Sequence, residues 1–182
     1  MRSLSILLPA AVIRARACPL ASIRQVRMWR LRFVEHDAGA GDLVRPAGWS
    51  DVVDAEAQPR TPQAGRVPTE LVGPGFRAWW DAPRRVEGPV RLRGELVVDP
   101  LDGLPTTGRI LRLRLLTETV RDDADRARVV GLTARDLSAI PKAVDDGRPS
   151  AGPGSGTTAV DVRTRDRGVL LDLEIAPGLG VA

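Results

Sequence analysis

The chain has 182 residues, which is enough for one ordinary domain with a buried core. It contains no tyrosine and only six other aromatic residues, so we expect the core to consist mainly of Leu, Val, Ile and Ala. The single cysteine, Cys18, excludes an intramolecular disulfide and a zinc site built from several cysteines.

The net charge of +4 is unevenly distributed along the chain. Residues 1–32 contain seven arginines and no acidic residue, whereas residues 33–182 contain 20 basic and 23 acidic residues. Most of the chain is therefore mildly acidic, which argues against a broad basic footprint for nucleic acid. Lys142 is the only lysine, and the preference for Arg, Ala, Gly and Pro indicates a GC-rich, bacterial genome.

Residues 1–27 are basic and have one short apolar run between Leu4 and Ile13. A membrane span takes roughly 20 apolar residues, and Arg16 argues against the signal-peptide or lipoprotein cleavage suggested by the small residues before Cys18. An organellar transit peptide has a similar composition. We interpret residues 1–27 instead as a disordered or non-native leader before a true start at Met28, and expect it to contribute nothing to the core.

Alternating apolar and polar residues predict the first strands of the domain. In residues 28–34 the apolar set is Trp29, Leu31 and Phe33, with arginines between them. Residues 49–53 form a second, shorter candidate. Residues 54–75 contain four prolines among polar residues, and we expect a long irregular loop there.

The clearest alternation lies in residues 90–98 and 111–116, separated by a segment rich in Pro, Asp and Gly that favours a turn. We predict that the two strands form an antiparallel hairpin with one apolar face. The opposite face would then collect four guanidinium groups: Arg91, Arg93, Arg112 and Arg114. Such a row could hold a phosphate backbone; the competing interpretation is a solvated face partly neutralised by neighbouring glutamates.

An aromatic patch, FRAWW, occupies residues 76–80. Tryptophans beside arginine can stack on bases when they are exposed. They can also fill the open end of a small barrel or sandwich, and this is the interpretation we prefer for at least one of Trp79 and Trp80.

The last third of the chain predicts five further elements. They are a turn at 122–125, a strand at 126–132, a short helix at 136–144 limited by Pro141, a linker at 145–156, and a closing hairpin of 157–164 and 168–175 before a tail at 176–182. Three carboxylates in the turn lack the ligand spacing of a calcium loop. The fold expected is a single mainly-β domain at 28–175, a small antiparallel barrel or sandwich with at most one short helix.

The sequence predicts no catalytic residue, no metal ligand set and no cofactor. His36 is the only histidine and lies between Glu35 and Asp37, which indicates a solvated loop residue rather than a general base. No glycine-rich segment has the lysine and the strand-to-helix context of a phosphate-binding loop.

Four segments resemble small uncharacterised actinobacterial proteins. They are the strand at Met28, the turn Gly41-Asp42-Leu43-Val44, and the strands from Thr107 to Leu113 and from Gly168 to Leu173. The resemblance spans most of residues 28–175 and implies neither an activity nor site residues.

Three functional hypotheses follow. The first is a non-enzymatic cytoplasmic protein that binds an unknown protein partner, because a β scaffold offers exposed edges and loops. The alternative is a nucleic-acid-binding small β-barrel that uses the four arginines, with Trp79 or Trp80 as a stacking platform. An enzyme using His36 comes third.

Overall fold

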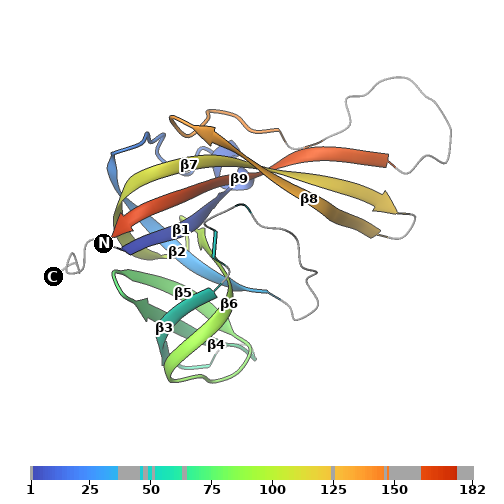
Figure 1. Ribbon diagram of the computed structural model, residues 1–182. Coiled ribbons are helices and arrows are strands. Elements are labelled where there is room, and N and C mark those ends of the chain that lie inside the picture. Colours follow the sequence, from blue (N-terminus) through green and yellow to red (C-terminus); the bar gives the residue numbers. More distant parts are fainter. Residues whose placement is uncertain are drawn as a thin grey trace.

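The computed structural model describes residues 2–36, 46, 49–50, 52–62, 65–123, 126–145, 147 and 161–175. Within these residues the chain is mainly β with one short helix, which confirms the expected fold class (Figure 1). The elements are β1 (Arg2–Pro9), α1 (Ala10–Arg14), β2 (Val26–Glu35), β3 (Val52–Pro59), β4 (Val67–Gly73), β5 (Phe76–Ala82), β6 (Gly88–Val98), β7 (Leu104–Asp123), β8 (Arg126–Leu137) and β9 (Asp161–Ile175).

Eight strands close into a barrel in the order β2-β5-β4-β3-β6-β1-β9-β7, and pairing between β7 and β2 completes the ring. The architecture is therefore a barrel rather than a sandwich. Pairing is antiparallel except for two single-position parallel contacts, Leu7 with Val97 and Arg32 with Trp79. β8 is not part of the ring. It pairs with β7 and is the last strand in the order of the sheet.

β2 confirms its predicted alternation and holds a central place in the barrel. Trp29, Leu31 and Phe33 are at most 2% exposed and belong to the main core. The first half of β2 pairs with β7 and its second half pairs with β6. β2 thus joins two strands that follow each other along the chain.

The predicted hairpin of residues 90–98 and 111–116 is consequently wrong, although both strands exist. β6 and β7 show no pairing with each other, and β2 lies against each of them. The turn between them is fastened to β2, since the Asp99 amide donates to the Arg30 carbonyl at 2.9 Å. Alternation determines the faces of a strand, but it does not determine its partner.

The prediction that residues 1–27 form a disordered leader outside the core is also wrong. β1 pairs with β9 over eight successive positions, from Arg2 opposite Ile175 to Pro9 opposite Gly168. Ile6 and Leu8 are fully buried in the main core, and Ile13 of α1 is 3% exposed. The apolar run that is too short for a membrane forms most of the barrel strand β1 and then most of the helix α1.

The predicted irregular loop at 54–75 instead contains β3 and β4, which pair with each other. Its prolines lie where they cost little: Pro59 ends β3, Pro68 is the second residue of β4, and Pro74 lies in the turn after it. Ala57 and Leu71 point into the core and are at most 1% exposed.

Two predictions near the C-terminus are wrong as well. Residues 136–144 contain no helix; β8 runs to Leu137, and Ile140 then donates its amide to the Ala21 carbonyl at 2.8 Å. The supposed closing hairpin is one continuous strand, β9, whose supposed turn at 165–168 is a β-bulge at Arg167.

Other predictions fall partly or wholly outside the described residues. The strand at 126–132 is confirmed as part of β8, and β7 and β8 form a hairpin around the predicted turn. Residues 41–44, nearly all of the 145–156 linker and the tail at 176–182 lie outside the description.

Candidate interaction surface

The four arginines expected to form one row are not brought together. Arg91 and Arg93 belong to β6, whereas Arg112 and Arg114 belong to β7, and β2 pairs with both of these strands. Arg91 is exposed and lies 3.3 Å from Asp54 of the neighbouring β3. The predicted nucleic-acid site therefore does not exist in the form that the sequence suggested.

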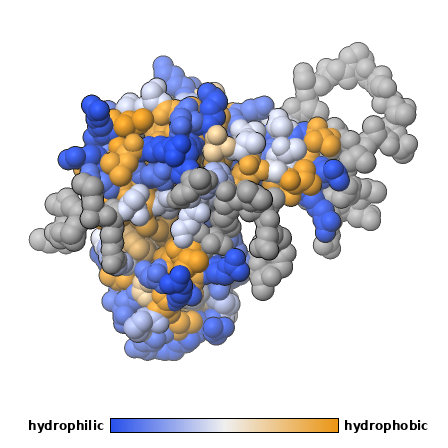
Figure 2. All heavy atoms as spheres, in the orientation of Figure 1, coloured by the Kyte–Doolittle hydropathy of each residue, from blue (hydrophilic) through white to orange (hydrophobic). Residues whose placement is uncertain are grey.

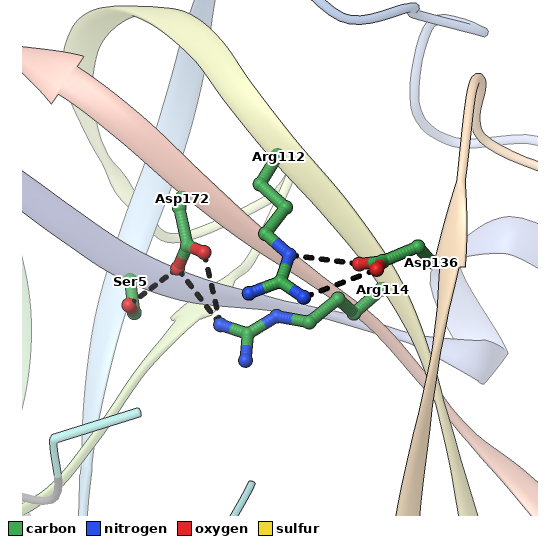
Figure 3. A network of polar contacts seen from close by, with 5 residues as sticks. All are labelled: Ser5, Arg112, Arg114, Asp136 and Asp172. Carbon is green, nitrogen blue, oxygen red and sulfur yellow. Dashed lines mark hydrogen bonds and ion pairs between the residues drawn. The ribbon is translucent and has the colours of Figure 1, made fainter. Parts of the chain in front are cut away.

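Arg112 and Arg114 are engaged within the protein (Figure 3). Arg112 donates from Nε and Nη2 to the two carboxylate oxygens of Asp136 at 2.7 and 3.1 Å. Arg114, which is 3% exposed, donates from Nη2 to both oxygens of Asp172 at 3.2 and 2.9 Å. Ser5 donates to the same Asp172 at 2.6 Å. Arg114 is therefore buried beside its partner, and the Nε and Nη2 donors of Arg112 are already taken by a carboxylate.

The ion pair between Arg112 on β7 and Asp136 on β8 shifts the pKa values of both groups. The hydrogen bond from Arg112 holds the pKa of the Asp136 carboxyl below its ordinary value, and the same contact raises the pKa of the Arg112 guanidinium. Both groups stay charged at neutral pH, so the pair neutralises itself.

The tryptophans divide between core and surface. Trp80 is 4% exposed and meets the ring of Phe33 edge to face, with centroids 6.0 Å apart at 86°. This confirms the core interpretation for one of the pair. Trp79 is partly buried on β5, where its Cα pairs with that of Arg32.

His36 borders an open hollow of about 860 Å³ between α1 and the strands β2, β5 and β6. Its Nε2 lies 3.6 Å from Oε1 of Glu95, and its side chain is 19% exposed, so it is not the solvated residue we expected. Arg32, also at the hollow, binds Asp81 and lies 3.7 Å from Asp99. Besides apolar residues, the lining of the hollow carries the charged residues Glu35, Asp81 and Asp99 together with Arg32 and Arg66.

A second small core on the outer face of the barrel was not anticipated. Trp49 packs there with Leu7, Leu116 and Leu170, each of which is at most 6% exposed. Arg167 at the β9 bulge lies 5.4 Å from the Trp49 ring centre and binds Glu95. The sequence signal for this cluster was Leu116, an apolar residue on the otherwise polar face of its strand.

Parts of β7, β8 and β9 extend beyond the barrel as a three-stranded arm, which we define as residues 117–123, 126–133 and 161–166 (Figure 1). Its sequence carries five arginines and five carboxylates, so its net charge is zero. Val130 and Val162 are exposed apolar residues of the arm, at 46% and 53%. In Figure 2 apolar and charged residues lie side by side on the arm.

β8 forms one edge of the arm, and β9 forms the other. Among the described strands β8 pairs with β7 alone, and Val130 lies at a register shift where Thr119 pairs with Gly131 and Val120 pairs with Val129. The exposed arginines Arg128 and Arg135 project from this edge strand. The combination of edge, exposed valine and arginine makes the arm the best candidate for contact with another molecule.

No helix within the described residues has the length and apolar character needed to cross a membrane. Comparison with protein-family models, with curated proteins and with solved structures finds no match for the chain.

Proposed function

We propose that the chain is a non-enzymatic, cytoplasmic protein-interaction domain that binds a protein partner through its arm. The observation that carries this proposal is the edge strand β8, displayed on an arm outside the barrel, with Val130 and Val162 about half exposed. Edge strands with accessible backbone groups bind extended segments of other proteins by adding a strand to the sheet.

The charge pattern favours a protein over a nucleic acid. A nucleic-acid surface collects cations along a phosphate path, whereas the arm balances its arginines with carboxylates. No aromatic residue lies within the arm, so it offers no stacking platform for unpaired bases. The arginines of the competing hypothesis, Arg112 and Arg114, are held by Asp136 and Asp172.

Site-specific photocrosslinking in cells of the source organism tests the proposal. A benzophenone amino acid replaces Val130 in one variant and Val162 in another. The control carries it at Leu101, which is 83% exposed but lies in the turn between β6 and β7, away from the arm.

We expect discrete protein adducts from both arm positions and none of the same mass from position 101. Nuclease-sensitive adducts would replace the proposal with nucleic-acid binding. Equal adducts at all three positions, or none at any position, would overturn it.

A further inference from the structure

We infer that the edge of β8 from Gly131, in the arm, to Leu137, at the base of the arm, receives an extended partner segment in which acidic and apolar side chains alternate. The inference rests on the proposed function and deepens it by specifying the chemistry of the partner. It follows from the two faces of one strand, which a segment added beside β8 must match position by position.

One face of this edge is cationic and hydroxylic. Arg135 and Thr133 lie opposite Leu115 and Thr117 of β7, and both are exposed. Arg128 continues the same face beyond the bulge, because it lies opposite Arg121. In the described part of the chain neither Arg128 nor Arg135 takes part in an ion pair or a side-chain hydrogen bond. Arg135 within the edge, and Arg128 just beyond it, favour carboxylates on this face of the added strand.

The other face is apolar or already neutral. Leu132 packs against the small outer core and Ala134 is exposed, so this face offers apolar contacts. Asp136 also lies here, but its carboxylate is held by both donors of Arg112. The second set of partner side chains, between the carboxylates, should therefore be apolar.

The same charges disfavour a second copy of this chain as the occupant. In an antiparallel pair of two such edges, residues of the same face lie opposite each other, so Arg135 would meet Gly131, Thr133, Leu137 or the second Arg135, and no carboxylate. Like charges directly opposite each other destabilise a sheet. The bulge at Val130 further limits the regular edge to seven residues, which suits a partner segment of similar length.

Defined peptides test the inference on the full chain. The probe is a fluorescent peptide in which Glu and Val alternate over six residues, flanked by Ser and Gly for solubility. Two matched peptides replace every Glu by Lys, or N-methylate alternate backbone amides so that the hydrogen-bond ladder cannot form. Fluorescence anisotropy measures the Kd of each.

Arg135→Glu is the main variant and Arg128→Glu the second, in case the first does not fold. The matched control is Arg84→Glu, which makes the same charge change at an exposed residue between β5 and β6, away from the β8 edge. Circular dichroism melts verify that each variant is folded.

We expect the Glu peptide to bind more tightly than both matched peptides. Arg135→Glu should weaken it by roughly fivefold or more, since a favourable cross-strand pair becomes a repulsive one. Arg84→Glu should leave the Kd unchanged, and Arg135→Glu should improve binding of the Lys peptide.

Equal affinity for the Glu and Lys peptides, or insensitivity to both edge variants, would overturn the inference. So would concentration-dependent dimers that the Glu peptide does not dissociate, because the edge would then be occupied by a second copy. Arm crosslinks to a partner without any preference for the Glu peptide would retain the proposed function and remove only this inference.

Discussion

Arg114 on β7 binds Asp172 on β9 along a diagonal of the sheet, not across a directly paired position. In the strand register Arg114 lies opposite Leu170, while Asp172 lies opposite Arg112. Arg112 in turn binds Asp136 of β8, which lies opposite Arg114. Two diagonal ion pairs therefore tie three strands together where the arm leaves the barrel (Figure 3).

Asp172→Asn should destabilise the protein far more than Asp136→Asn. The first substitution leaves the charge of Arg114, 3% exposed, without its carboxylate, and breaking a buried pair on one side costs about 3–5 kcal/mol. The second removes an exposed pair, whose contribution to stability is small because water screens the two charges. Urea unfolding curves give the two differences in the free energy of unfolding.

A double variant, Arg114→Met with Asp172→Leu, separates charge from packing. Replacing both partners removes the buried charge together with its carboxylate, so we expect recovery of most of the stability lost in Asp172→Asn. A double variant as unstable as the single one would show that the diagonal contact, and not the buried charge, provides the stabilisation.

The Asp136 carboxyl should titrate below the ordinary range of an aspartate, because the hydrogen bond from Arg112 lowers its pKa. A depressed folded-state pKa means that this contribution to stability is present above the unfolded-state pKa and is lost as the pH falls through the folded-state pKa. Carboxyl NMR measures the titration directly. Arg112→Ala should raise the pKa of Asp136 toward its ordinary value, because it removes the largest cause of the shift, and an unchanged pKa would contradict the contact.

Leu8→Ala should lower the free energy of unfolding by about 2–5 kcal/mol, because it opens a cavity at a fully buried position of the main core. Ser3→Ala, at an exposed position on the same strand, should change it by no more than about 0.5 kcal/mol. Thermal and urea unfolding provide the measurement. Similar, small effects of both substitutions would show that β1 is dispensable for the barrel.

Gly168→Ala should disrupt the pairing of β1 with β9. Gly168 has a φ of +153°, and an added Cβ would lie 2.2 Å from the Leu8 carbonyl oxygen, so the backbone must move. Gly131→Ala is the matched control, because its Cβ would meet Thr119 at an ordinary 3.5 Å. Hydrogen exchange of the β1 amides should accelerate in the first variant alone, and equal protection in both would contradict the close approach.

Much of the local structure followed from the order of residues. The period-two pattern of Trp29, Leu31 and Phe33 predicted a strand with its buried face, and the same pattern predicted the strands now seen as β6 and β7. These predictions succeeded because a strand places neighbouring side chains on opposite faces. Burial of one face therefore produces an alternation of apolar and polar residues that can be recognised in the sequence.

Turn chemistry was a weaker guide than alternation. Residues 165–168 looked like the turn of a hairpin, but β9 passes through them with a bulge at Arg167 and continues its pairing with β7. The prolines of residues 54–75 suggested a loop, yet Pro59 ends β3 and Pro68 lies at the start of β4. Glycine, proline and charged residues suit both a turn and a bulge, and only the neighbouring strands decide between them.

Which strands pair with each other was decided by the tertiary structure alone. The sequence determined that the chain is mainly β and which faces of β2, β6 and β7 are apolar, but placing β2 against both β6 and β7 required the closed ring. The same closure brings residues 2–9 beside β9, more than 150 positions away, and directs Arg114 to Asp172 rather than to a phosphate site. Alternation acts between adjacent residues, whereas strand pairing depends on which apolar faces can be buried together over the whole barrel.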